Sequence, residues 1–386
     1  MRSVLPFVAA VLVGASACSD STRPLDETPS LAASHGAIPD QYIVVFTSDV
    51  TRVPEVAADM AREHAATPLH VYQYSIRGFA ARMSAQAAAR LARDPRVAYV
   101  EPDGVVQLPP DENPGAKAPP SSKARPGTGS TCTSVAQTIP WGISRVGGPV
   151  SSGGRAWIID TGVDYTHCDL NVNTTLAKTF VARTTTANDD NGHGTHVAGT
   201  TAAMNNNYGV VGVAAGAAVI PVKVLDKRGS GTWSGVIAGV DYVAANGQSG
   251  DVANMSLGGG VYTPVDDAVK AASETGVEFA LAAGNERDDA NNHSPARVNG
   301  TNIYTVSAFS NGGAWASFSN YGNPPVDYAA PGVSILSTWK GGGYNTISGT
   351  SMATPHVAGL LLLGAIRADG TVTGDPDGNP DPIAHR

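Results

Sequence analysis

Apolar residues repeat with alternating strand and helix periods between Gln41 and Leu108, and a second pattern begins near residue 131. In the first part, short apolar runs predict strands and amphipathic stretches predict helices. The predicted elements are a strand at 42–46, a helix at 53–65, a hairpin of 71–74 and 78–81, a helix at 84–92 and a strand at 97–100. This β-α-β-β-α-β order is typical of a small ferredoxin-like α+β domain.

Beyond residue 131, apolar runs of strand length alternate with helix-length segments. The predicted strands are 156–159, 219–225, 252–257, 277–283 and 303–307, and the predicted helices are 194–204, 234–246, 265–275 and 351–365. Strands buried on both faces and interleaved with helices predict a three-layer α/β fold with a central, mainly parallel sheet. In such sheets the functional site lies beyond the carboxyl ends of the strands, where Asp160 and Asn285 are expected.

The remaining segments are targeting signals, spacers or linkers. Arg2, the apolar stretch 4–13 and Ala15-Ser16-Ala17 form an export signal with its cleavage site. Cys18 follows directly, and lipidation at Cys18 and simple secretion both remain open. Pro and Gly crowd residues 109–130, which predicts an exposed linker. The expected organisation is therefore a signal at 1–18, a polar spacer at 19–39, a small domain at 40–108, the linker at 109–130, and a large domain at 131–386 with a solvated polar tail from about 367.

Charge and composition exclude several function classes. A net charge of −8 argues against a nucleic-acid partner, since phosphate binding requires a basic surface. No internal apolar run is long enough to span a bilayer, so membrane attachment is expected only through a lipid at Cys18. With 44 Gly, 26 Pro and only 15% charged residues, the chain is typical of a loop-rich globular enzyme, expected to be a monomer.

Three short runs bring an Asp, a His and a Ser in that chain order. They are Ile159-Asp160-Thr161-Gly162, Asn191-Gly192-His193-Gly194-Thr195-His196 and Gly349-Thr350-Ser351-Met352-Ala353-Thr354-Pro355-His356. A serine hydroxyl becomes a nucleophile when an imidazole takes its proton, and a carboxylate then orients and stabilises the imidazole. The H-E-x-x-H motif of zinc proteases and the G-x-S-x-G elbow of lipases and esterases are both absent, which disfavours those two classes.

The long motifs around these residues resemble those of the subtilisin-like (subtilase) serine proteases, from about Ala136 to Ala365. The resemblance implies that Ser351 is the nucleophile, His193 the general base and Asp160 its orienting carboxylate. It also implies that Asn285, in Ala282-Ala283-Gly284-Asn285, donates to the oxyanion. His196 and His356 are expected to be packing residues.

The same resemblance implies how substrate binds. Gly229-Ser230-Gly231 is similar to the family's exposed edge strand, and Ser256-Leu257-Gly258-Gly259 to the strand opposite it. An extended peptide that pairs between two strands is held by its backbone, which favours broad specificity. The small residues Gly258, Gly259, Ala282 and Ala283 imply an open apolar pocket for the residue before the cut, with no acidic residue placed to demand Arg or Lys.

Two cation sites are also implied by the resemblance, and the first of them bears on whether Cys132 and Cys168 form a disulfide or stay two free thiols. The calcium ligands would be the side chains of Gln137, Asp169 and Asn206 with the carbonyls of Met204, Tyr208 and Val210, which is an oxygen shell suited to a hard cation. A weaker site would use Asp327 with the carbonyls of Thr301 and Ile303. Calcium joining Gln137 to Asp169 would bring Cys132 close to Cys168, and export permits their disulfide.

The function expected from the sequence is an exported serine endopeptidase of broad specificity, made as a zymogen. The small domain resembles the family's inhibitor-like propeptide, so the partners would be protein or peptide substrates and the chain's own propeptide. Catalysis would need no cofactor, and calcium would be structural. The maturation site falls between about 108 and 136. The alternative is a non-catalytic, peptide-binding protein of the same fold, which a covalent label on the serine would distinguish.

Overall fold

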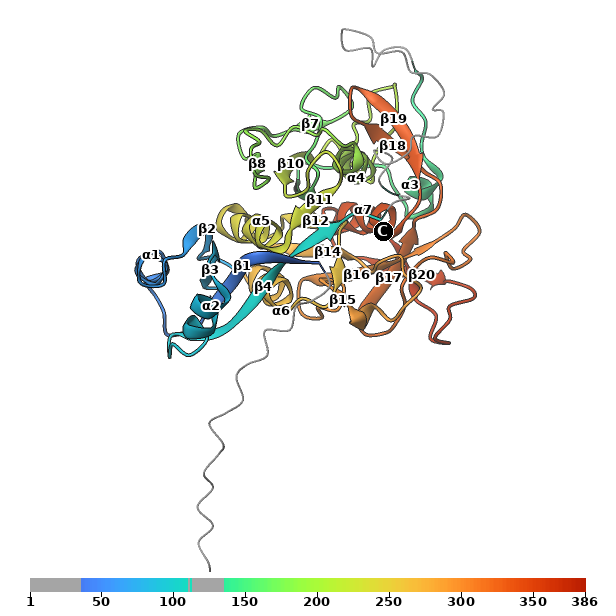
Figure 1. Ribbon diagram of the computed structural model, residues 1–386. Coiled ribbons are helices and arrows are strands. Elements are labelled where there is room, and N and C mark those ends of the chain that lie inside the picture. The colour runs from blue at the N-terminus through green and yellow to red at the C-terminus, as the bar shows by residue number, and fades with distance from the viewer. Residues whose placement is uncertain (1–35, 110–111, 113–134) are drawn as a thin grey trace, which may run out of the picture. The chain divides into compact units, whose positions relative to one another are not determined.

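The computed structural model describes residues 36–109, 112 and 135–386. The predicted export signal, Cys18, Cys132 and most of the linker lie outside these residues. In the described part of the chain, a five-stranded and a ten-stranded sheet form the framework of the fold (Figure 1). The helices of this part are too short or too polar to cross a bilayer.

The small domain confirms the ferredoxin-like prediction. Its elements are β1 (Ala37–Phe46), α1 (Val53–Glu63), β2 (Thr67–Tyr72), β3 (Gly78–Arg82), α2 (Ala85–Leu91) and β4 (Val97–Gln107). The strand order is β4-β1-β3-β2, with antiparallel neighbours. Ser84 caps α2 by accepting a hydrogen bond from the Ala87 backbone N–H. A Cβ at Gly78 would lie 2.2 Å from the Val44 carbonyl oxygen, so β3 can approach β1 only with glycine there.

The central sheet of the large domain is parallel across its core. Its main strands are β6 (Arg155–Asp160), β10 (Ala218–Lys223), β12 (Val252–Met255), β14 (Glu278–Ala282), β16 (Ile303–Phe309) and β17 (Val326–Pro331). They lie in the order β17-β16-β14-β12-β6-β10, and every adjacent pair is parallel. This topology confirms the predicted mainly parallel α/β sheet.

Helices cover both faces of this sheet. They are α4 (His193–Ala202), α5 (Trp233–Asn246), α6 (Thr263–Ser273) and α7 (Thr350–Leu361). Side chains alternate along β6, so Trp157 and Ile159 pack in the cluster with α5 and α6, while Ile158 packs with α4. A third cluster joins α7 to β14 and β16. The core thus lies in two layers, one on each side of the sheet.

Shorter elements complete the large domain. They are α3 (Trp141–Arg145), β5 (Val150–Ser151), β7 (Asn171–Val172), β8 (Lys178–Thr179), β9 (Ala214–Ala215), β11 (Ser230–Thr232), β13 (Gly259–Gly260), the 3₁₀ turn Ala290–Asn292, β15 (His293–Ser294), β18 (Ile335–Trp339) and β19 (Gly343–Ile347).

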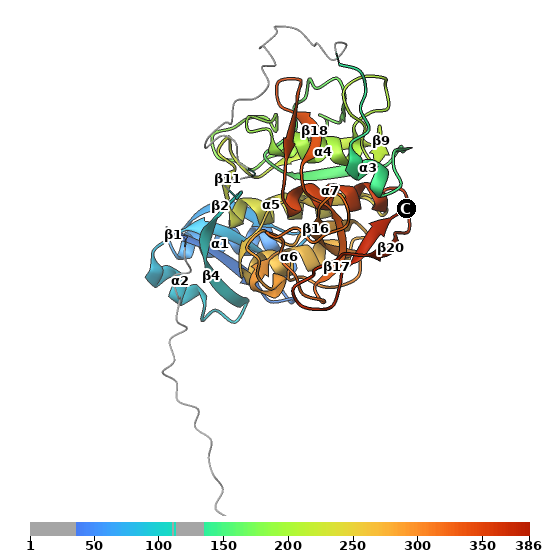
Figure 2. The ribbon, with the colours of Figure 1, turned by 90° about the vertical axis from the view of Figure 1, so that its right-hand side faces the viewer.

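The end of the chain differs from the predicted solvated tail. It forms β20 (Arg367–Thr371) and β21 (Pro382–His385), and β21 joins the sheet in parallel beside β17 (Figure 2). Ile383 and Ala384 are buried, and the buried Asp381 carboxylate accepts hydrogen bonds from Ser307 and Asn323. The prediction was wrong here because two apolar residues within a polar tail are enough to add a strand to an open sheet edge.

The small domain lies against α5 and α6 of the large domain (Figure 1). Ile43, Tyr72 and Val106 belong to the same buried cluster as Val236 and Ile237 of α5. β4 then continues into the large domain, where it pairs with β11 in antiparallel register, Gln107 opposite Ser230. The two domains therefore share one continuous hydrophobic core.

Candidate active site

Asp160 and His193 meet at the carboxyl end of β6. Asp160 is the last residue of that strand and His193 the first residue of α4, and both side chains are buried. His193 Nδ1 lies 2.9 Å from both carboxylate oxygens of Asp160, and Asp160 Oδ1 also accepts the Thr161 N–H at 2.6 Å. A Cβ at Gly194 would lie 2.1 Å from the Gly162 carbonyl, so glycine lets the start of α4 lie against the end of the strand.

Ser351 is the second residue of α7, and the helix holds its backbone in an unusual way. Pro355 stands four residues later and has no N–H, so it cannot bond to the Ser351 carbonyl. That carbonyl instead accepts a hydrogen bond of 2.8 Å from Ser256 Oγ, and Asn254 Nδ2 donates to the same hydroxyl. The proline thus frees a backbone group that ties Ser351 to the strand end after β12.

Asn285 follows β14 and faces the same point. Its Oδ1 accepts from the Thr350 N–H at 2.9 Å and from Thr350 Oγ1 at 3.1 Å. Because the oxygen is fixed by Thr350, the Nδ2 donor is turned towards the Ser351 side. The four residues predicted to be catalytic are thus brought together by the ends of β6 and β14 and the starts of α4 and α7.

A cavity of about 600 Å³ opens beside Ser351. Its walls include Leu257, Gly258, Gly259, Ala282, Ala283, Gly284, Asn285, Glu286, His293, Ser294, Ala296, Phe318, Ser348, Gly349 and Thr350. The small and apolar residues fit the expected open pocket. Glu286 also lines the cavity, and its side chain is 48% exposed.

A carboxylate from the linker occupies the centre of this arrangement. Glu112 is 1% exposed, and its Oε2 accepts a hydrogen bond of 2.6 Å from Ser351 Oγ. The same Oε2 lies 3.5 Å from His193 Nε2, while Oε1 accepts from Asn285 Nδ2 at 2.8 Å. The prediction that residues 109–130 are exposed is therefore wrong for Glu112.

The protonation of His193 reflects these two carboxylates. Burial by itself lowers the pKa of the imidazole, but the charge of Asp160 and the hydrogen bond to it, together with Glu112, more than offset burial and raise the pKa to about 10. His193 is thus an imidazolium at neutral pH in this form of the chain. An imidazolium can stabilise negative charge, but it cannot accept the proton of Ser351.

Comparison with known proteins identifies the family. Residues 157–367 match the Subtilase family, and residues 41–109 match Peptidase inhibitor I9. The chain belongs to the subtilase family. Its small domain is an I9 propeptide domain, and the large one carries the subtilisin-like fold.

Individual relatives agree with this placement. Alkaline serine exoprotease A of Vibrio alginolyticus is 40% identical over 361 residues, which cover 88% of this chain and 63% of the relative. The extracellular serine proteinase of a Thermus strain is 38% identical, covering 90% of this chain and 86% of the relative. A crystal structure of a cold adapted subtilisin-like serine proteinase superposes with a TM-score of 0.56 at 41% identity, covering 64% of this chain and 97% of that one.

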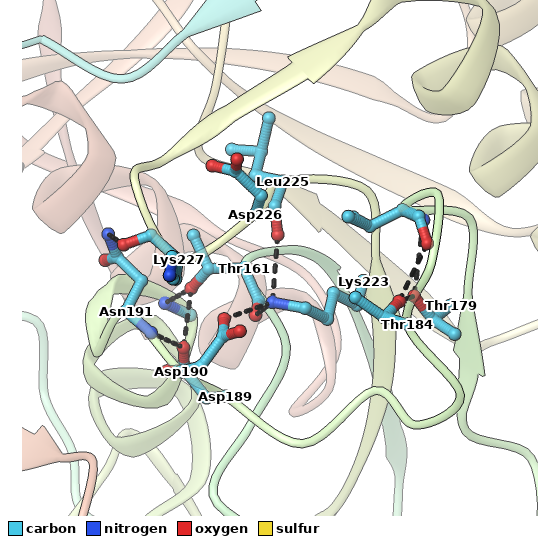
Figure 3. A network of polar contacts seen from close by, with 12 residues as sticks. Thr161, Thr179, Thr184, Asp189, Asp190, Asn191, Lys223, Leu225, Asp226 and Lys227 are labelled. Atoms are coloured by element: carbon cyan, nitrogen blue, oxygen red, sulfur yellow. Dashed lines mark hydrogen bonds and ion pairs between the residues drawn. The ribbon is translucent and has the colours of Figure 1, made fainter.

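A buried polar network supports the Asp160–His193 pair, and the motifs gave no sign of it. Asp189 Oδ1 accepts from Thr161 Oγ1 and from the backbone N–H of Gly192, the residue before His193. The buried Lys223 ammonium donates to the Thr161 carbonyl at 2.5 Å, to Asp190 at 2.7 Å and to the Leu225 carbonyl at 3.0 Å (Figure 3). These contacts fix the backbone on both sides of the pair.

The strand predicted to hold substrate is occupied by the propeptide domain. β11 contains Ser230 and Gly231 and pairs with Gln107 and Val106 of β4, and the Leu108 N–H donates to the Gly229 carbonyl at 2.9 Å. On the opposite side, Gly259 pairs instead with Ser294, as β13 joins β15. The β4–β11 pairing supports strand addition as the binding mode at one wall of the cleft.

Two carboxylates hold the propeptide domain on α5. Asp241 Oδ1 accepts the backbone N–H groups of Gln73, Tyr74 and Ser75 and the Ser75 hydroxyl, at 2.7–3.0 Å. In the other direction, Asp103 of β4 accepts the Ser234 N–H at the start of α5, where a carboxylate complements the helix dipole. Each domain therefore supplies one buried acid to the other.

The predicted calcium ligands lie together. Gln137 Nε2 donates to the carbonyls of Met204 at 3.0 Å and Val210 at 3.4 Å, while the Asp169 carboxylate accepts from Asn206 Nδ2 at 2.8 Å. Tyr208 pairs with Ala136 in an isolated bridge beside them. A half-turn of the Gln137 amide would direct its oxygen at those carbonyls, an arrangement that a cation between them would stabilise, so the donor set fits a hard cation.

Other predicted residues have simpler surroundings. Burial raises the pKa of the Asp327 carboxyl to about 6. This carboxylate accepts a hydrogen bond of 2.8 Å from the N–H of Thr305, a residue close in sequence to Thr301 and Ile303. Cys168 is disulfide-bonded, whereas its expected partner Cys132 lies outside the described residues.

The two further histidines have the surroundings expected of packing residues. Each is buried and has one ring nitrogen 2.9 Å from a backbone carbonyl, that of Ile335 for His196 and that of Met352 for His356. Burial lowers their pKa values to about 3 and about 4. Both imidazoles are therefore neutral.

Proposed function

We infer that this subtilase is an exported serine endopeptidase of broad specificity that is made as a zymogen. The observation that carries the inference is the meeting of three groups, Ser351, Asn285 and the Asp160–His193 pair, around one carboxylate at the edge of the cavity that Ser351 and Asn285 line. The alternative, a protein that binds peptides without cutting them, gives no reason for a buried carboxylate–imidazole pair beside a serine hydroxyl. The residue roles below are proposals that follow from this geometry.

Once Glu112 has left the centre, Ser351 Oγ attacks the carbonyl carbon of the substrate peptide while His193 Nε2 takes the hydroxyl proton. Asp160 holds the Nδ1–H tautomer and stabilises the imidazolium that forms. Asn285 Nδ2 donates to the oxyanion of the tetrahedral intermediate. His193 then protonates the leaving amine, and water enters by the reverse path to hydrolyse the acyl-enzyme. No cofactor takes part in these steps.

Substrates are extended protein or peptide segments that add as a strand to β11, as β4 does in this structure. Backbone pairing reads no side chains, which supports broad specificity. The pocket favours apolar residues through Ala282, Ala283 and Gly258. Glu286, exposed at its rim, adds tolerance for a basic residue.

Export, processing and assembly complete the proposal. The signal at 1–18 sends the chain out of the cytoplasm, either as a secreted protein or with a lipid on Cys18, and the name of the Thermus relative supports an extracellular location. The domain limits proposed are 40–108 for the propeptide and 131–386 for the enzyme, with the maturation cut between about 108 and 136. The enzyme works as a monomer.

Calcium is the proposed structural cation, held by Gln137, Asp169 and Asn206 with the carbonyls of Met204, Tyr208 and Val210. Asp327 with the Thr301 and Ile303 carbonyls is the proposed weaker site. A disulfide between Cys132 and Cys168 would tether the start of the mature enzyme next to Asp169. Neither device touches Ser351, so both are expected to act on stability.

The test of the proposed function is Ser351→Ala. This variant should lose peptide hydrolysis by about a million-fold, as removal of the triad serine does in subtilisin, and should keep its propeptide attached because one nucleophile serves both reactions. Ser310→Ala removes a serine hydroxyl that donates to the Ala314 carbonyl and does not line the cavity, and this variant should behave as the unchanged protein. Release of the 41–108 block by purified Ser351→Ala protein, or absence of labelling of mature wild-type enzyme by a serine-directed fluorophosphonate, would contradict the proposal.

A further inference from the structure

Glu112 is a buried charge whose carboxylate oxygens face the proposed catalytic groups. A carboxylate out of water is costly unless it is paired and hydrogen-bonded. Here Ser351 Oγ, Asn285 Nδ2 and the His193 imidazole supply those partners. The Glu112 N–H donates to the carbonyl of Pro109, which lies two residues after the end of the β4–β11 pairing at Gln107.

This contact interrupts the proton path of the proposed reaction. A serine hydroxyl has one proton to donate, and the shorter hydrogen bond of Ser351 Oγ is the one to Glu112 Oε2, at 2.6 Å against 3.2 Å to the Ser256 carbonyl. The nitrogen that should receive it, His193 Nε2, makes no hydrogen bond within the described part of the chain. Glu112 Oε2 thus stands between the nucleophile and its base.

The second oxygen of the same carboxylate blocks the oxyanion site. Glu112 Oε1 lies 2.8 Å from Asn285 Nδ2, which is the distance at which this donor would hold an oxyanion. Oε1 also packs directly on Gly349, where an added Cβ would stand 1.4 Å from it. A negatively charged group therefore already occupies the place where negative charge would develop.

We propose that Glu112 is an autoinhibitory latch, which disarms the catalytic centre of the precursor by occupying both the serine–histidine gap and the oxyanion site with one side-chain carboxylate. This proposal rests on the proposed zymogen function and adds a second means of inhibition to it. The β4–β11 pairing blocks the cleft through backbone contacts. Glu112 acts on the nucleophile itself, because its carboxylate accepts the hydrogen bond of the Ser351 hydroxyl. The group of the precursor that meets Ser351 Oγ is a side-chain carboxylate, which has no peptide bond to be cut.

The experiment compares full-length precursors of the wild type, Glu112→Gln and Glu112→Ala, with Glu55→Gln as the control. Glu55 lies on the exposed face of α1, and its described contact is an ion pair with Arg52. Freshly purified precursor is mixed with a fluorophosphonate probe and quenched at short times, and label is counted only on the unprocessed band. Mature wild-type enzyme is labelled in parallel.

Glu112→Ala precursor should be labelled at least about tenfold faster than wild type, the factor that corresponds to 1.4 kcal/mol, with Glu112→Gln in between and Glu55→Gln unchanged. Equal rates for wild type and Glu112→Ala, or a wild-type precursor that is labelled as fast as the mature enzyme, would overturn the latch. If Glu112→Ala does not fold, the isosteric Glu112→Gln carries the same comparison. Absence of label on the mature enzyme would instead refute the proposed function, so the two failures are distinguishable.

Discussion

At the scale of single residues, buried charges hold the reacting groups in place. Lys223 occupies the end of β10, opposite Asp160 in the sheet register, and its ammonium links the Thr161 carbonyl to the Leu225 carbonyl. A buried lysine is tolerated because all three of its protons have acceptors. Its effect on the site is indirect, through the backbone that carries Asp160.

Lys223→Met should therefore act on stability and on turnover together. The methionine fills the volume but leaves two buried carbonyls without donors, at about 1–3 kcal/mol each, so the melting temperature of the mature enzyme should fall by about 5 °C or more. As Asp160 loses its support, kcat should drop about tenfold while KM changes little. Lys270→Met, on the exposed side of α6, is the matched control. An unchanged kcat would show that Lys223 has only a structural role.

The charge of His193 makes the stability of the precursor depend on pH. Its pKa is raised from 6.5 to about 10, so the folded state binds this proton more tightly than the unfolded chain. The resulting stability is fully present below pH about 6.5 and is lost as the pH rises towards 10. Melting temperatures of the Ser351→Ala and Ser351→Ala/His193→Gln precursors should differ most near pH 6 and converge by about pH 10.5. A gap that stays constant would contradict a protonated His193.

At the scale of elements, helix α5 is the support on which the propeptide domain lies. Its Asp241 receives the turn between β2 and β3, and its first residues are capped by Asp103 from β4. Both contacts join charged oxygens to backbone N–H groups, which are the stronger kind of hydrogen bond. The propeptide is therefore held by carboxylate–backbone hydrogen bonds as well as by strand pairing.

Asp241→Ala should weaken the precursor and spare the mature enzyme. The change removes the acceptor of three backbone N–H groups, which we expect to cost about 2–4 kcal/mol in the precursor. In the mature enzyme these propeptide groups are gone, so its melting temperature should stay within about 1 °C of the wild type. Differential scanning calorimetry measures the melting temperatures of the Ser351→Ala precursor and of the processed enzyme, each with and without Asp241→Ala. Equal losses in the two forms would contradict a role in holding the propeptide.

At the scale of the whole molecule, the two domains are built as one body. Buried residues from β1, β2 and β4 share a cluster with α5, α6 and the strands of the large sheet. Removal of the propeptide must therefore expose apolar surface on α5 and α6. The mature enzyme then depends on other interactions for its stability. The proposed calcium site and disulfide are the candidates.

Chelation should shorten the life of the heated mature enzyme without slowing its chemistry. The proposed calcium joins the segment at Gln137 to the loop at 204–210, remote from Ser351, so EDTA should cut the half-life at elevated temperature several-fold. Initial rates at low temperature should be unchanged. Cys168→Ser should shorten the half-life further, because the disulfide would keep the same segments together after calcium leaves. Half-lives that are equal with and without chelator would refute the calcium proposal.

The sequence by itself determined the fold class and the candidate catalytic residues of this protein. Continuous apolar runs such as 156–159 and 303–307 predict buried parallel strands, because only a strand covered on both faces can be apolar throughout. The Asp160, His193 and Ser351 motifs were recognisable because a close approach such as that of Gly194 to Gly162 restricts several neighbouring residues at once. Such signals involve residues that are neighbours along the chain, so they can be recognised from the sequence without the tertiary structure.

Only the tertiary structure decided what the polar residues between these motifs do. Glu112 belongs to a Pro- and Gly-rich stretch whose composition predicts a solvated linker, yet it is buried because its carboxylate meets Ser351 close to the end of the β4–β11 pairing. Asp189, Lys223 and Ile383 likewise take their roles from partners in distant segments of the chain. The side chain of an aspartate, a glutamate or a lysine is solvated or buried according to the hydrogen-bonding partners around it. Those partners are defined only when distant segments of the chain have come together.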